Sequence, residues 1–207
     1  MRYTGPKARR VRRQGVNIYG SEKYDRLLQR KPYAPGMQAA SRTGKVKISE
    51  YGKQLLEKQK VAFMYGVHDT RLRAIFREAS ERQGQTDAMM HTLLESRLDN
   101  ALFRAGFSTT RMQSRQFVSH GMFTVNGVRV TIPSYKIKVG DKVKVREQRK
   151  SSPVFPAILA AHERYSAPDW IKADPATLSF EIIGLPTEEK HFDSSIDMRK
   201  VIGYYSR

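Results

Sequence analysis

The spacing of apolar residues changes within residues 94–130, and this change limits what the chain can fold into. From Leu94 to Ala105 they recur every three to four residues, as on one face of a helix. After Gly121 they alternate with polar residues, as in a strand with one buried face. Asn126-Gly127 interrupts the alternation, and such a pair is typical of a tight hairpin because both turn positions need positive φ. The segment predicts helices packed on a small antiparallel sheet, an α+β fold.

A short helix is predicted between the helical face and the alternating residues. Either Ser108 or Thr109 can begin it, because a hydroxyl at a helix start accepts hydrogen bonds from unpaired backbone N–H groups. We expect this helix to end at about Ser119. Arg111 and Arg115 are four residues apart, so they share one of its faces.

A second alternating pattern occupies residues 136–146, with Lys or Arg at the even positions and mostly apolar residues at the odd ones. Gly140-Asp141 is the expected turn. One face of the predicted sheet is then buried and the other densely basic. Crowded cations repel one another unless a polyanion covers them. We interpret this face, together with the helix face carrying Arg111 and Arg115, as a binding surface; an ordinary solvated face is the alternative.

Three helices are predicted within residues 44–94. The first begins near Ser49, whose hydroxyl can cap it, and ends at Tyr65-Gly66. The second ends at Gln83-Gly84, and the third begins after Thr86-Asp87. Apolar residues at helical spacing in each of them indicate a common core.

Residues 1–43 are rich in arginine and are interrupted by glycine and proline, which break long helices. We predict an irregular basic arm. Two states are compatible with its composition: a solvated, disordered tail, and a segment that orders when it lies along phosphates. Ser151-Ser152-Pro153 is a linker signal near the other end of the chain. Helices are expected over residues 156–165 and near residues 196–202.

The net charge of +18 is concentrated in the first three quarters of the chain. Residues 1–150 contain 32 of the 38 Lys and Arg residues, but only 12 of the 20 Asp and Glu residues. A polyanionic partner is expected, either nucleic acid or an anionic membrane surface. The predicted helices lack the exposed apolar face that membrane binding requires. No apolar run approaches the length of about 20 residues that spans a bilayer. We favour nucleic acid and a cytoplasmic location.

The sequence offers little for catalysis or for metal binding. Cysteine is absent, which excludes disulfides and thiolate zinc sites. Neither a glycine-rich phosphate loop nor a zinc-protease motif occurs, and the five histidines lack metal-ligand spacing. Asp99 would more readily pair with Arg97 or Arg104 than act as a catalytic acid. We therefore expect no enzymatic activity, no cofactor, no metal and no small-molecule substrate.

Motifs along nearly the whole chain resemble one known family. Within residues 97–127 they resemble the small RNA-binding module named after small-subunit ribosomal protein number four. Those outside resemble the bacterial form of that ribosomal protein family, the S-four family. The motifs are Arg97-Leu98-Asp99-Asn100, Thr110-Arg111-Met112-Gln113-Ser114-Arg115 and Val125-Asn126-Gly127 in the module, and Arg2-Tyr3-Thr4-Gly5-Pro6, Lys31-Pro32-Tyr33-Ala34-Pro35-Gly36, Ser49-Glu50-Tyr51-Gly52, Tyr65-Gly66-Val67 and Tyr204-Tyr205-Ser206-Arg207 elsewhere.

The resemblance implies a mainly helical domain into which the RNA-binding module is inserted. The module consists of two helices packed on a small β-sheet. The implied parts are a basic N-terminal arm at residues 1–43, the first part of the helical domain at 44–94, the module at 95–158, and a C-terminal segment at 159–207 that completes the helical domain.

The function that the resemblance implies is that of a structural component of the small ribosomal subunit. Members of the family bind a multi-helix junction of small-subunit ribosomal RNA early and help to nucleate assembly. They contact neighbouring ribosomal proteins at an interface linked to translational fidelity and lie near the channel through which mRNA enters. Some repress their own mRNA.

Two departures from the family pattern affect the expected sites. Some members bind zinc through N-terminal cysteines, and the stretch from Arg30 to Arg42 has none, so no zinc is expected. The family usually shows Glu-Arg-Gln where this chain has Asp69-Thr70-Arg71. The cation expected at position 70 is absent, and Arg71 is the candidate substitute.

Two rival functions use the same module. An RNA-modifying enzyme needs a catalytic domain, for which residues 151–207 are too few. A stand-alone RNA-binding chaperone or stress factor does not account for the N-terminal motifs. We predict contacts with small-subunit ribosomal RNA from basic residues along the whole basic region: Arg2, Lys7, Arg9, Arg10, Arg12, Arg13, Lys45, Lys47, Lys53, Lys58, Lys60, Arg71, Arg73, Arg97, Arg104, Arg111, Arg115, Lys136 and Lys138.

Overall fold

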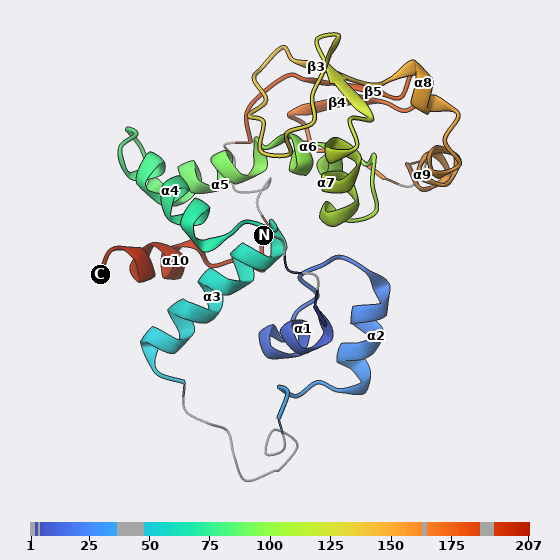
Figure 1. Ribbon diagram of the computed structural model, residues 1–207. Coiled ribbons are helices and arrows are strands. Elements are labelled where there is room, and N and C mark those ends of the chain that lie inside the picture. Colours follow the sequence, from blue (N-terminus) through green and yellow to red (C-terminus); the bar gives the residue numbers. More distant parts are fainter. Residues whose placement is uncertain (1–2, 4, 37–47, 163–164, 187–192) are drawn as a thin grey trace. The chain divides into compact units, whose positions relative to one another are not determined.

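The computed structural model describes residues 3, 5–36, 48–162, 165–186 and 193–207, and it contains two compact units (Figure 1). Unit one consists of Met1–Asp87 and Asp193–Arg207, and unit two of Ala88–Phe192. Unit one is helical in its described residues, whereas unit two combines helices with an antiparallel sheet. The predicted α+β class is confirmed.

In unit one, α3 (Glu50–Met64) and α4 (Asp69–Ser80) begin and end close to where the sequence predicts. The hydroxyl of Ser49 accepts the N–H of Gly52 at 3.2 Å, which confirms the expected cap of α3. Gly66, with φ +60°, follows the last turn of α3. The chain can therefore reverse into α4 without strain.

The C-terminal helix α10 (Met198–Tyr205) lies against α3 and α4 (Figure 1). The ring of Tyr205 stacks on that of Phe76 in α4, with 5.5 Å between centroids. Before the helix, the carbonyl of Ser195 accepts a hydrogen bond from the Lys60 ammonium at 3.0 Å. These contacts fasten the end of the chain to helices that lie more than a hundred residues earlier.

The N-terminal segment differs from the irregular arm that the sequence predicts. It forms two short helices, α1 (Ala8–Gln14) and α2 (Glu22–Arg30). Val11, Ile18 and Tyr24 are buried and supply a small apolar centre. Glycine and proline lie between these helices and after them, so they limit helix length without preventing helix formation.

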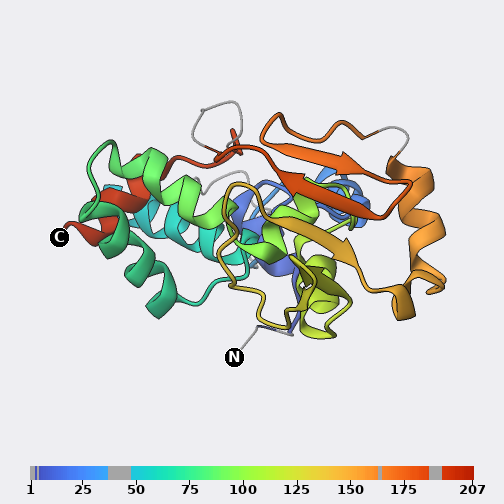
Figure 2. The same ribbon diagram turned by 90° about the horizontal axis from the view of Figure 1, so that it is seen from above.

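Unit two is built on a five-stranded antiparallel sheet with the order β2-β1-β3-β5-β4. Figure 2 shows β4 and β5 side by side in orange and red, with the yellow β3 next to β5. The first helix of this unit, α5, is the fifth described helix of the chain and crosses the boundary between the units. The bounds are α5 (Thr86–Glu95), α6 (Leu98–Arg104), α7 (Arg111–Ser119), β1 (Phe123–Val125), β2 (Val128–Arg129), β3 (Lys142–Val145), α8 (Glu147–Lys150), α9 (Val154–His162), β4 (Ile171–Asp174) and β5 (Ser179–Ile182).

The predicted hairpin at Asn126-Gly127 is confirmed. These residues have φ of +50° and +84°, and β1 pairs with β2 on either side of them. The second alternating pattern is confirmed only in part: Gly140, with φ +88°, lies in the expected turn and the strand β3 follows it. Residues 136–139 form no strand, and Val139 is 56% exposed. The carboxylate of Asp141 accepts the Lys138 N–H at 2.8 Å, which holds this segment in a turn before β3.

Two further expectations need correction. Thr110, rather than Ser108 or Thr109, caps α7, because the Ser108 hydroxyl is buried against that of Ser114 while Thr110 accepts the Gln113 N–H. The C-terminal segment was expected to complete the helical domain as a whole. Instead, β5 pairs with β3, so residues 171–182 extend the sheet of unit two and only residues 193–207 join unit one.

The core of unit two lies between the sheet and helices α6, α7 and α9. Phe107, just after α6, stacks on Phe180 of β5 with 5.7 Å between centroids. The ring of Phe123 in β1 packs edge-on against that of Phe107. Apolar residues at the predicted helical spacing, Leu98, Ala101, Leu102 and Ala105, are fully buried. The two helices before the sheet are therefore fixed against it, and so are the backbone positions of the arginines that they carry.

Candidate nucleic-acid interface

Four arginines of α6, α7 and the residue before α6 meet two carboxylates in unit two. Glu95, at the end of α5, is fully buried. Its two oxygens accept hydrogen bonds from Nε and Nη2 of Arg104 at 2.8 and 2.9 Å. Nη2 of Arg111 lies 3.8 Å from the same carboxylate. The side-chain amide of Asn100 donates to Glu95 and accepts from Arg111 Nε at 2.8 Å, so it joins the two.

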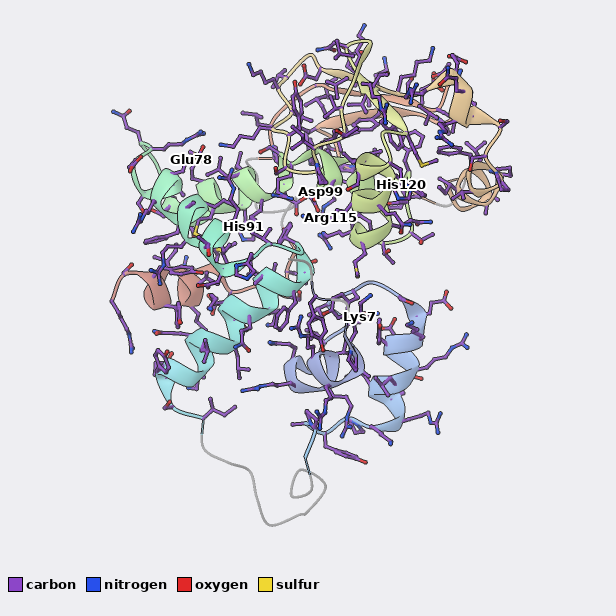
Figure 3. All side chains as sticks on the ribbon, in the orientation of Figure 1. Lys7, Glu78, His91, Asp99, Arg115 and His120 are labelled. Atoms are coloured by element: carbon purple, nitrogen blue, oxygen red, sulfur yellow. The ribbon has the colours of Figure 1, made fainter. Side chains whose placement is uncertain are left out.

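Asp99 is the second carboxylate. Arg97 donates to both of its oxygens, from Nε at 3.0 Å and from Nη2 at 2.7 Å. Nη1 of Arg115 lies 3.4 Å from Oδ2, the oxygen that accepts from Arg97 Nη2, and Figure 3 shows Asp99 and Arg115 close together between α6 and α7. The expected pairing of Asp99 with Arg97 is confirmed. Arg104, the other candidate partner, binds Glu95 instead.

The structure thus divides the predicted arginines of unit two by depth. The Arg97 side chain is only 6% exposed and is neutralised by Asp99. The side chains of Arg104, Arg111 and Arg115 are 21%, 15% and 30% exposed. Arg111 also lies over the ring of Phe103, 4.6 Å from its centroid. We call Arg97, Arg104, Arg111 and Arg115, together with Glu95 and Asp99, the arginine cluster. Its outer layer consists of Arg104, Arg111 and Arg115.

The sheet is less uniformly basic than the sequence predicts. Lys142 lies 3.8 Å from Glu181 of β5. Lys144 and Lys150 both contact Glu147, and the hydrogen bond from Lys150 lowers the pKa of that carboxyl below its usual range. These acids lie outside residues 128–140, where no acid occurs in the sequence. Lys136 and Lys138 are exposed.

Arg129 and Arg146 lie near the end of α7 and were absent from the predicted sites. Arg146 donates to the carbonyl of Gly121 at 3.3 Å. A Cβ at Gly121 would approach Arg129 Nε to 2.3 Å, so the guanidinium lies directly against this glycine. The signal that could have found Arg129 is the hairpin itself, whose register pairs it with Thr124, whereas Arg146 is placed by the pairing of β1 with β3.

The arginines of α1 fall into two pairs. Arg10 lies over the rings of Tyr3 and Phe63, at 3.3 and 3.9 Å from their centroids. Arg12 lies over the ring of Tyr33 and donates to its carbonyl at 3.1 Å. By contrast, Arg9 and Arg13 are exposed and four residues apart, so they share the outer face of the helix. Lys7 precedes α1 and lies 5.5 Å from the ring centroid of Tyr19 (Figure 3).

The cations of α3 and α4 also differ in their surroundings. Lys60 is buried, with Glu57 at 2.6 Å, and Lys58 donates to Asp69 at 2.8 Å. The Lys58 hydrogen bond lowers the pKa of Asp69. Burial, and then the hydrogen bond to Asp69, raise the pKa of Tyr205. The remaining predicted cations of these helices are exposed: Lys53, Arg71 and Arg73.

Three predicted RNA-binding residues, Arg2, Lys45 and Lys47, lie outside the residues that the structure describes. Within the described ranges, no group of three or more His, Asp or Glu side chains could hold a metal ion. None of the described helices is long and apolar enough to cross a membrane.

Comparison with known proteins gives matches along the whole chain. A family model described as the ribosomal protein S4/S9 N-terminal domain matches residues 2–95, and a model of the S4 domain matches residues 96–143. A protein of Roseiflexus sp. (strain RS-1), named small ribosomal subunit protein uS4, is 40% identical over 208 residues, covering 100% of this chain and 99% of its own. Proteins of the same name from Heliobacterium modesticaldum and Borrelia duttonii are each 41% identical, over 210 and 202 residues, with at least 96% of every chain covered. This chain belongs to the uS4 family.

The uS4 family models meet inside the arginine cluster. The first match ends at Glu95, and the second begins at residue 96, just before Arg97. Beyond residue 143, where neither model matches, the uS4 relatives still align, so the resemblance extends to β5 and β4. The S-four resemblance inferred from the motifs is thereby confirmed.

Proposed function

We propose that this chain is a structural component of the small ribosomal subunit and binds its ribosomal RNA. The observation that carries this proposal is the identity of 40% with a small ribosomal subunit protein uS4 over the entire length of both chains. A shared module alone would align only over residues 96–143. Alignment through the N-terminal helices and through α10 favours the ribosomal protein over a stand-alone RNA-binding chaperone or stress factor.

The charge distribution supports RNA as the partner. Residues 1–150 contain 32 Lys and Arg against 12 Asp and Glu, and they include the exposed face of α1 and the outer layer of the arginine cluster. Rigid arginines on helices suit phosphates, because a planar guanidinium can donate two parallel hydrogen bonds to one phosphate. Folded RNA is recognised largely through such backbone contacts and through its shape.

Finer parts of the proposal come from the family resemblance. They are early, direct binding to a multi-helix RNA junction, nucleation of assembly, contacts with neighbouring small-subunit proteins, and a contribution to translational fidelity. Proximity to mRNA and a cytoplasmic ribosomal location belong to the same set. We propose that the chain does all this by binding alone, without catalysis, cofactor or metal.

Direct binding and assembly are tested separately. Purified protein is titrated with full-length small-subunit ribosomal RNA at several salt concentrations, without other ribosomal proteins. We expect tight binding that weakens steeply with salt, because each phosphate contact releases counterions. A nearly flat salt response, or binding no tighter than to transfer RNA, would contradict direct recognition.

Assembly is tested in cells with an epitope-tagged chain on sucrose gradients. We expect the tagged protein to co-migrate with small subunits and to remain there after a high-salt wash. A chaperone would instead stay at the top of the gradient or leave with the wash, and that result would overturn the structural role.

A further inference from the structure

The acids of the arginine cluster lie deeper than its three outer arginines, Arg104, Arg111 and Arg115. The side chains of Glu95 and Asp99 are 0% and 6% exposed, whereas the exposed fraction reaches 30% at Arg115. A carboxylate within a phosphate-binding surface repels the ligand, so an acid at this place calls for an explanation. The depth of the acids is part of the explanation, because solvent and any phosphate meet the arginines first.

The geometry gives these acids an orienting effect. A guanidinium is planar and carries its five N–H groups in fixed directions. One hydrogen bond to a fixed carboxylate therefore restricts the directions of all the others. Asp99 is itself fixed, because Arg97 donates to both of its oxygens and its own N–H donates to the carbonyl of Pro133 at 3.2 Å. Arg115 thus contacts a carboxylate that Arg97 already holds in place.

Restricting an arginine before it binds favours affinity. A free Arg side chain loses rotamer entropy when it is immobilised. A side chain that is already ordered loses less upon binding. This gain in affinity opposes the loss that comes from repulsion between the acid and the phosphate. Removing the acid therefore changes the RNA affinity in opposite directions, depending on which effect dominates. Repulsion alone predicts that loss of the carboxylate tightens RNA binding, whereas orientation predicts that it weakens binding.

We propose that Asp99 is a positioning residue for RNA binding, which orients the guanidinium of Arg115 for a backbone phosphate while itself remaining beneath the surface. Glu95 has the corresponding relation to Arg104 and Arg111. This inference rests on the proposed function, since it presupposes that the cluster faces RNA.

A double-mutant cycle tests the inference. The four proteins are the unchanged chain, Asp99→Asn, Arg115→Gln and the double variant, each titrated with full-length small-subunit ribosomal RNA in a salt series. We expect Asp99→Asn to weaken binding about five-fold or more, although it raises the net charge by one. Arg115→Gln weakens binding to a similar extent, and the double variant is no weaker than Arg115→Gln alone, because Asp99 acts through Arg115.

Glu181→Gln is the matched control. It also removes one negative charge from unit two beside a cation, Lys142, but both side chains are well exposed at 40% and 71%. Its RNA affinity should equal or exceed that of the unchanged chain. Equal or tighter binding by a folded Asp99→Asn variant would overturn the proposal, and so would additive losses in the double variant.

Loss of Asp99 leaves Arg97 buried beside an uncharged amide, so this variant is first checked by its melting temperature. If it does not fold, Arg115→Lys decides, because it keeps the charge and the Asp99–Arg97 pair but lacks the planar fork. We expect a several-fold loss of affinity for Arg115→Lys, and unchanged affinity would refute the positioning role. Failure of the unchanged chain to bind the RNA refutes the proposed function instead, so the two failures are distinguishable.

Discussion

The helix α1 and the arginine cluster both concentrate arginines, but different groups hold them in place. In α1, Arg10 and Arg12 lie on aromatic rings. In the cluster, Arg97 and Arg104 bind buried carboxylates at 2.7 to 3.0 Å. A ring holds a cation without neutralising it, whereas a carboxylate removes one unit of charge. The number of arginines in a segment therefore overstates the positive charge that the segment presents to a ligand.

The difference has an energetic consequence. Removing one partner of a buried ion pair leaves the other charge buried and uncompensated, which is far more costly than breaking an ion pair at an exposed site. Removing an arginine from an aromatic ring leaves no such charge behind. The cluster should therefore respond to the loss of an acid mainly through stability, and α1 to the loss of arginines mainly through local order and RNA binding.

The largest expected effect is on folding, at Glu95. Glu95→Gln should lower the free energy of unfolding by about 3 kcal/mol or more, because Arg104 and Arg111 both lie against this fully buried carboxylate. Chemical denaturation followed by circular dichroism measures the change. Glu181→Gln, at an exposed pair, should change stability by less than about 0.5 kcal/mol. Similar effects of the two variants would show that burial does not distinguish these pairs.

An intermediate effect is expected within α1, where two double variants remove the same charge. Arg10→Gln with Arg12→Gln should loosen the helix, since contacts between a cation and a ring contribute about 0.5–2 kcal/mol each. Hydrogen exchange of the α1 amides should therefore become faster. Arg9→Gln with Arg13→Gln should leave that exchange unchanged, because both side chains are exposed.

The RNA affinity of the second pair completes the test. A plot of log RNA affinity against log salt concentration falls with salt. Arg9→Gln with Arg13→Gln should make this fall less steep, by roughly 0.7–0.9 in slope for each phosphate that the variant no longer neutralises. The opposite pattern, with faster exchange in this variant and an unchanged salt slope, would show that the outer face of α1 supports the fold and does not contact RNA.

Sequence reasoning succeeded where the deciding contact is local. Ser49 caps α3 by accepting an N–H three residues ahead, Asn126-Gly127 forms its own turn, and Asp99 pairs with Arg97 two residues away. Each of these follows from the geometry of neighbouring residues. The hydrophobic spacing of residues 94–105 was reliable for the same reason.

The rest depends on partners that are distant in sequence. Arg10 lies over the ring of Phe63, and the Lys60 ammonium donates to the carbonyl of Ser195. Neither pairing leaves a signal in spacing or composition. The predicted binding residues were chosen by charge, which does not reveal that Lys60 is buried against Glu57. Which predicted cations contact RNA is decided by the tests above.

The smallest expected effect is on the pH dependence of stability, and it arises in unit one rather than in the arginine cluster. The pKa of Asp69 is lowered from its ordinary value of 3.8, chiefly by the hydrogen bond from Lys58. A carboxyl whose pKa is lower in the folded state stabilises the fold above its unfolded pKa, and this contribution is lost as the pH falls through the folded value. Asp69 therefore contributes fully at neutral pH and progressively less below about pH 4.

Unfolding free energies of the unchanged chain and of Asp69→Asn, measured from pH 7 down to pH 3, test this point. The two proteins should differ most at pH 7 and converge as the pH falls below 4. The difference should be modest, because the Asp69 side chain is 45% exposed and water screens its pair with Lys58. Equal unfolding free energies at every pH would assign the stabilisation to the hydrogen bond from Tyr205, because the amide oxygen in Asp69→Asn can still accept it. Such equality would also show that ionisation of Asp69 plays no part in joining α10 to α4.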